Sequence, residues 1–144
     1  QRPGPSTVPV EVSDTGFAPA VSDVFTSASG TFANAAGSTV TFNWYIDRAN
    51  ALSQKSELID SFTFAASDSL ASFSHNFTRD LLNAIADPYS MTMAMVLTLA
   101  AGGELTNLSQ TEQSPVLSQV PEPACLALLG LGLAGLALSR RRRV

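Results

Sequence analysis

The chain has 144 residues, which is room for one domain of ordinary size and a tail. Hydrophobic residues make up 45% of it, whereas charged residues make up 14%, well below the roughly 25% of a typical soluble domain. Up to Ser139 the chain holds 4 cationic and 12 acidic side chains, a balance of −8, and the other four cations are consecutive arginines at 140–143. This acidic body excludes a nucleic-acid-binding surface, and the single Cys and single His exclude a disulfide scaffold and a Cys/His zinc site.

The first 21 residues contain four prolines and little apolar periodicity, so they are expected to form an extended N-terminal segment. At most, an edge strand is expected over residues 8–12. The chain starts at Gln1, which fits either a removed signal peptide or a fragment of a longer precursor.

The clearest strand is predicted over residues 38–46, where apolar and polar side chains alternate strictly. Val40, Phe42, Trp44 and Ile46 share one face, and Tyr45 lies on the other. Residues 47–56 break the pattern and are expected to form a loop. Further strands are predicted at 22–32, 57–65, 70–77, 89–100 and 104–110, the last after a Gly102-Gly103 turn.

One short stretch is predicted as a helical turn. In residues 79–86 the side chains of Leu81, Leu82 and Ile85 fit helical spacing, and Pro88 follows. Apart from this turn, the body is expected to be all-β. The predicted fold is an antiparallel β-sandwich or jelly roll over residues 22–110, followed by a polar linker at 111–119.

Residues 124–139 carry no charge and are apolar on every side, which predicts a single C-terminal transmembrane helix. Sixteen helical residues span about 24 Å, short of the ~30 Å hydrocarbon core, and snorkelling arginines would lengthen the effective span. The positive-inside bias would hold Arg140, Arg141, Arg142 and Arg143 in the cytoplasm and the body outside it. The predicted span runs through Ala124, Leu128, Gly132, Leu136 and Ser139.

The order of elements in this tail is more specific than a hydrophobic segment alone. Val120, Pro121, Glu122 and Pro123 precede the Leu/Gly/Ala span, and the arginine cluster follows it. This order resembles the PEP-CTERM sorting signal of exported bacterial proteins, and residues 41–51 and 87–110 are similar, more loosely, to parts of short proteins with that signal. The resemblance implies export, recognition and cleavage by an exosortase-type membrane protease, and delivery to the cell surface or exopolysaccharide matrix.

The body offers little support for catalysis. Its acids are expected to be solvated turn residues, because no calcium-binding loop pattern is present and sequence spacing cannot establish a carboxylate pair. His75, between Phe73 and Phe77, is expected to be a satisfied or edge-facing histidine. No catalytic, metal or cofactor residues are therefore predicted. Tyr45 is the one candidate glycan contact, because an outward aromatic ring can stack on a sugar.

The expected function is that of a non-catalytic surface or exopolysaccharide-matrix protein. Its expected partners are the sorting protease, the inner membrane before processing, and the exopolysaccharide. A carbohydrate-binding or ice-binding module, and a permanently anchored membrane protein with an external domain, remain alternatives.

Overall fold

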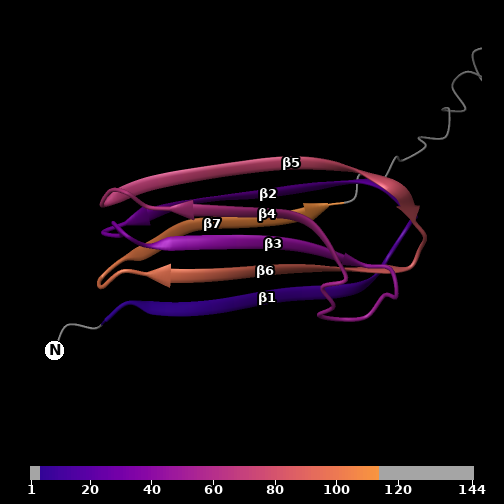
Figure 1. Cartoon of the computed structure of the whole chain (residues 1–144), viewed down its shortest axis with the longest axis horizontal. Coiled ribbons are helices and arrows are strands. Elements are labelled where there is room, and N and C mark those ends of the chain that lie inside the picture. The colour runs from indigo at the N-terminus through magenta and orange to yellow at the C-terminus, as the bar shows by residue number, and fades with distance from the viewer. Residues whose placement is uncertain (1–3, 114–144) are drawn as a thin grey trace, which may run out of the picture.

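The computed structural model describes residues 4–113, which contain seven antiparallel strands and no helix (Figure 1). Within these residues there is accordingly no helix that could cross a membrane. The predicted transmembrane helix and sorting residues lie outside the described part of the chain. The strands are β1 (Ser6–Phe17), β2 (Val21–Ala33), β3 (Thr39–Asp47), β4 (Glu57–Ala65), β5 (Leu70–Ile85), β6 (Tyr89–Leu99) and β7 (Glu104–Gln113).

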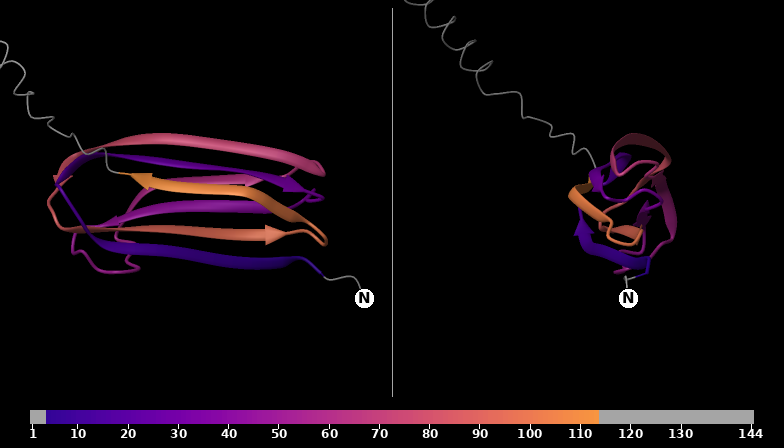
Figure 2. Two further views of the ribbon diagram at one scale, coloured as in Figure 1. Left: turned by 180° about the vertical axis from the view of Figure 1, so that it is seen from behind. Right: turned by 90° about the vertical axis from the view of Figure 1, so that its left-hand side faces the viewer.

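The strands form two sheets that pack face to face, as the end view in Figure 2 shows. One sheet has four strands in the order β1-β6-β3-β4, and the other has three in the order β5-β2-β7. Across the sandwich, β5 packs against β4 and β7 against β6. The prediction of an all-β antiparallel body is therefore confirmed.

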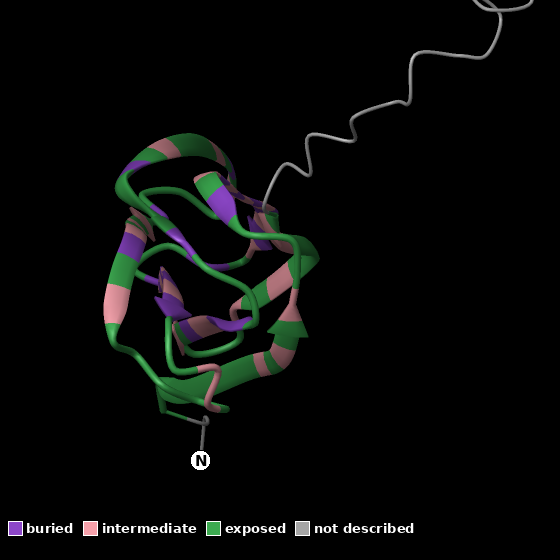
Figure 3. Cartoon of the chain, turned by 90° about the vertical axis from the view of Figure 1, so that its right-hand side faces the viewer, coloured by how far each residue is buried: buried purple, intermediate pink, exposed green. Residues whose placement is uncertain are grey.

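Strict alternation places the core where the sequence predicts it. The four apolar side chains of β3, from Val40 to Ile46, are fully buried, and Tyr45 alternates with them on the other face. Figure 3 shows buried positions alternating with less buried ones along the strands. Met91 and Met95 of β6 pair with Ile46 and Phe42 and are also buried. Flexible thioethers fill gaps between the aromatic rings of the two sheets.

The N-terminal segment is more ordered than its prolines suggest. Residues 6–17 form β1, which pairs along most of its length with β6. The domain therefore begins at Ser6, and its predicted start at residue 22 was wrong. Proline is uncommon in strands but is tolerated at a sheet edge, and Pro9 lies in the edge strand β1. The alternating valines around it therefore resemble an unpaired extended segment in the sequence.

The predicted helical turn at residues 79–86 was also wrong, because these residues continue β5 to Ile85. Leu81 and Ile85 are both buried, and a spacing of four residues shares a face in a strand as well as in a helix. Leu82 distinguishes the two structures, and it is fully exposed. A register irregularity between β2 and β5 here lets residues 81–84 depart from regular pairing.

The C-terminal boundary of the sandwich also differs from the prediction. Strand β7 continues to Gln113, paired with Phe25 of β2. Residues 111–113, expected to open the linker, thus belong to the sheet.

Candidate functional site

A polar cluster lies inside the sandwich and joins the two sheets. Asp60 of β4 accepts a hydrogen bond from the Thr26 hydroxyl at 2.6 Å, and its same oxygen, Oδ2, lies 2.7 Å from His75 Nε2. The His75 ring stacks on Phe62 and on Trp44, with centroid distances of 4.4 Å and 5.9 Å. The prediction of a hydrogen-bonded histidine is confirmed.

This cluster has the residue types of an acid–base pair and is largely buried, with the His75 and Asp60 side chains 21% and 9% exposed. Thr26 is fully buried, and aromatic rings cover the His75 imidazole. Within residues 4–113, no three His, Cys, Asp or Glu side chains are grouped so as to hold a metal ion. The arrangement fits a polar link between the sheets, because Asp60 pairs with both the Thr26 hydroxyl and His75 Nε2.

A second acid is buried, contrary to the expectation that the acids are solvated turn residues. Asp47 ends β3 and accepts hydrogen bonds from the Ser56 hydroxyl at 2.6 Å and the Ala51 N–H at 2.9 Å. These hydrogen bonds lower the pKa of Asp47 below its ordinary value. The carboxylate thereby holds residues 48–56 in a loop, and the Ser90 hydroxyl secures this loop to β6 by donating to the Ala51 carbonyl.

Tyr45 lies beside this loop, on the outer face of the four-stranded sheet, and is half-buried. The Lys55 ammonium lies 6.0 Å from the centroid of its ring and 2.8 Å from a Glu11 carboxylate oxygen. A cation at that distance interacts with an aromatic face. Lys55 therefore occupies one face of the Tyr45 ring. This makes the ring less accessible for stacking against a sugar.

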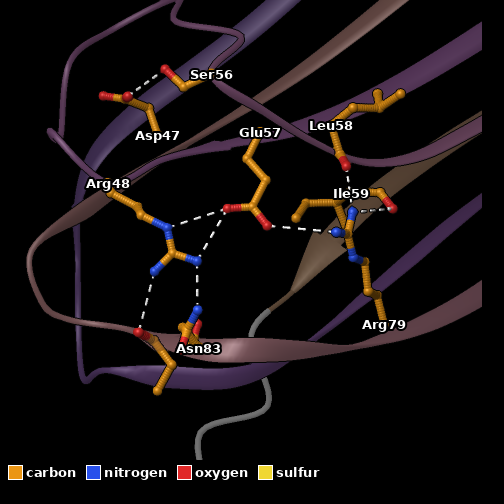
Figure 4. Close-up of polar contacts among 9 residues, drawn as sticks. Asp47, Arg48, Ser56, Glu57, Leu58, Ile59, Arg79 and Asn83 are labelled. Carbon is orange, nitrogen blue, oxygen red and sulfur yellow. Dashed lines mark hydrogen bonds and ion pairs between the residues drawn. The ribbon is translucent and has the colours of Figure 1, made fainter.

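Two arginines cover the side of the sandwich where the edge strands β4 and β5 meet (Figure 4). Arg79 of β5 donates to the Leu58 and Ile59 carbonyls of β4. Arg48, just after β3, donates to the carbonyls of Asn83 and Ala84 in β5. Both arginines also pair with Glu57, at 3.1 Å and 3.6 Å. These contacts satisfy backbone carbonyls that would otherwise be free at a sheet edge.

The outer face of the three-stranded sheet is the most distinctive surface. The registers of β5, β2 and β7 place three rows of three small, uncharged polar side chains side by side. We call this surface the hydroxyl face. Its residues are Ser27, Ser29, Thr31, Ser72, Ser74, Asn76, Thr106, Ser109 and Thr111.

Many hydroxyls of this face are free to bind water or a ligand. Thr31 and Ser72 bond each other at 3.1 Å, and Thr106 bonds the Thr31 carbonyl. The side chains of Ser29, Ser74 and Ser109, which form the central row, have no protein hydrogen bond within residues 4–113. The period-two pattern in residues 27–31 and 72–76 indicates polar strand faces, but it does not show that β2, β5 and β7 bring them together in one surface.

The comparisons with known proteins concern the tail alone. Residues 119–143 match the family model of the PEP-CTERM protein-sorting motif. No curated protein and no solved structure matches the chain. The matched segment contains the predicted motif, span and arginine cluster, from Val120 to Arg143, and follows β7 by five residues.

Proposed function

Because this chain carries a PEP-CTERM protein-sorting motif, we propose that it is a non-catalytic component of the cell surface or exopolysaccharide matrix. The motif supports export and sorting through an exosortase, which is a membrane protein. In the proposed route, the tail first spans the inner membrane with Arg140–Arg143 in the cytoplasm. Cleavage near Pro121-Glu122-Pro123 then releases the β-sandwich outward.

The observation that carries the proposed role of the body is the hydroxyl face. Its rows are spaced as strands are, about 4.8 Å between neighbours and about 7 Å between same-face residues along a strand. An extended polysaccharide presents hydroxyls that can hydrogen-bond with such an array. No residue of the face is charged, so binding of a glycan does not require counter-ions to be displaced. When no glycan is bound, the hydroxyls can hydrogen-bond with water.

Specific sugar stacking on Tyr45 is the second candidate. It is supported by the outward position of the ring, and Lys55 over one face of the ring weighs against it. Ice binding has some support in Thr7, Thr39 and Thr98, which lie in one row across three strands of the other sheet. Asn43 and Tyr45 interrupt the array farther along β3, so we place this alternative below glycan binding.

The test compares binding of the full chain, in detergent, to exopolysaccharide from the host. One variant removes three hydroxyls of the hydroxyl face, as Ser74→Ala, Ser109→Ala and Thr111→Ala together. The matched control removes three hydroxyls from the outer face of the other sheet, as Ser61→Ala, Thr63→Ala and Thr98→Ala. Tyr45→Ala tests the second candidate.

We expect the hydroxyl-face variant to bind at least about five-fold more weakly and the control to bind like the unaltered chain, since the loss of even one hydrogen bond costs about 1 kcal/mol. Loss of binding in Tyr45→Ala alone would favour the stacking module, because an aromatic contact contributes on the order of 1 kcal/mol. Hydrolysis of the glycan, or equal binding by every variant, would contradict the proposed role.

A further inference from the structure

The two sheets differ in width by one strand, and this difference leaves part of an inner face uncovered. Since β7 packs on β6, no strand of the three-stranded sheet lies opposite β1 (Figure 2). Val8, Val10 and Val12 of β1 pair with Leu97, Met95 and Met93 of β6, so they point to the inner side of the sheet. They are nevertheless 45%, 42% and 57% exposed, and we call them the valine stripe.

The same side of the sandwich has two open sheet edges. Within residues 4–113, β1 pairs only with β6, and β7 pairs only with β2. On the opposite side, Arg48 and Arg79 donate to edge carbonyls of β5 and β4. No arginine or lysine side chain makes such a contact to β1 or β7 in the described part of the chain. Asn50 accepts from the Gly16 N–H at the C-terminal end of β1, and the rest of this side has no such cover in the described residues. The molecule therefore closes one side and leaves most of the other open to a strand.

We propose that a second copy of this chain covers the valine stripe, with β1 of each copy lying beside β7 of the other. The three-stranded sheet has one strand fewer than its neighbour, and the strand that extends beyond it is β1 itself. Consider a two-fold axis that runs parallel to the strands, midway between the two sheets. Rotation about this axis exchanges the planes of the two sheets. It therefore places β1 of each copy in the plane of the partner's three-stranded sheet, next to the partner's β7. Such an interface is isologous and closes on itself, as most homodimer interfaces do.

The strand directions fit this arrangement. Strands β1 and β7 run the same way along the sandwich (Figure 1), so a two-fold axis parallel to them sets β1 parallel to the partner's β7. Pro9 removes one N–H donor from β1, and parallel pairing is slightly less stable per residue than antiparallel pairing. The contact of the two valine stripes must therefore supply much of the association energy.

The dimer would also extend the outer surface. In each sheet plane the three strands β5-β2-β7 of one copy continue into the four strands β1-β6-β3-β4 of the other. The hydroxyl face then adjoins the outer face of the partner's larger sheet, which carries the hydrogen-bonded pairs Thr7–Thr98 and Thr41–Thr63. Because each body carries a large excess of acidic side chains, added salt should favour the dimer.

The experiment measures the oligomeric state of the full chain in detergent micelles by sedimentation velocity. The test variant is Val10→Asp, on the valine stripe. Its matched control is Val96→Asp, since Val96 is also 42% exposed but lies on the outer face of the neighbouring strand β6. Fluorescence of the one tryptophan, the fully buried Trp44, verifies that each variant is folded.

We expect the unaltered chain and Val96→Asp to be dimeric, and Val10→Asp to be monomeric with an unchanged Trp44 spectrum. In a Cys125→Ser background, Val10→Cys should form a disulfide-linked dimer and Val96→Cys should not. A monomeric unaltered chain would overturn the proposal, and would mean that another segment or nothing covers the stripe. A dimer that Val10→Asp leaves intact would also overturn it, since the tail would then hold the copies together.

Discussion

At the scale of single residues, Asp60 should be the acid whose removal most destabilises the body. Asp60→Ala deletes the acceptor for Thr26 and His75 and leaves both polar groups buried without their partner. We expect the free energy of unfolding to fall by about 2–4 kcal/mol, the range for a broken buried hydrogen-bond network. Urea denaturation, followed by the fluorescence of Trp44, measures this change in the free energy of unfolding.

Asp68→Ala, in the exposed turn before β5, is the control and should change stability by less than about 0.5 kcal/mol. Equal effects of the two changes would refute the structural role of the cluster.

Glu112 of β7 should make the stability of the fold fall as the pH rises from about 4.5 to about 8. Both carboxyl oxygens are buried without a hydrogen-bond partner in the described part of the chain, and burial raises the pKa of Glu112 from 4.5 to about 8. The folded state therefore holds this proton more tightly than the unfolded state. The contribution of Glu112 is fully present below about pH 4.5 and is lost as the pH rises through about 8.

Glu112→Gln should remove this pH dependence, which is about 4 kcal/mol between pH 4.5 and pH 9 for a pKa raised from 4.5 to about 8. The measurement is the free energy of unfolding of the unaltered chain and the variant across that range. Glu104→Gln, an exposed change on the same strand, should keep the slope of the unaltered chain. If the slope persists in Glu112→Gln, the carboxyl is not the group responsible.

At the scale of elements, Leu81 and Leu82 distinguish the strand from the predicted helical turn. Leu81→Ala should destabilise the fold by about 2–3 kcal/mol because its side chain is buried, whereas Leu82→Lys should be close to neutral because that side chain is fully exposed. In an amphipathic helical turn, both side chains would face the core. Thermal unfolding of the two variants therefore decides between the structures, and comparable losses would contradict the strand.

The elements that the sequence predicted well are those with a strong local pattern. In β3, Phe42 and Trp44 alternate with polar residues, and the structure buries both. Strand β1 was underestimated because an edge strand buries little, so Val10 looks the same in a lead-in as in a sheet. The hydroxyl face depends on β2 meeting β5 and β7 in a given register, and pairing between distant strands is not encoded in any local pattern. The sorting motif, by contrast, is contiguous from Val120 to Arg143, so the sequence alone was enough to identify it.

At the scale of the whole molecule, the body and the tail have separable tasks. Glu122→Ala, or deletion of Arg140–Arg143, should leave full-length precursor in the inner membrane while the sandwich still folds. The reason is that the proposed route assigns recognition to the motif and the depth of the span in the bilayer to the arginines. Fractionation of host cells with an antibody to the body measures this. A matched change in the body, Asp68→Ala, should be processed normally.

Mass spectrometry of the protein recovered from the host cell surface shows whether the tail is a removable sorting signal. We expect an intact mass and C-terminal peptides that end near Pro121-Glu122-Pro123, with nothing detected from the span or the arginine cluster. Surface protein that retains peptides beyond Pro123 would contradict this expectation, and would identify the chain as a permanently anchored membrane protein.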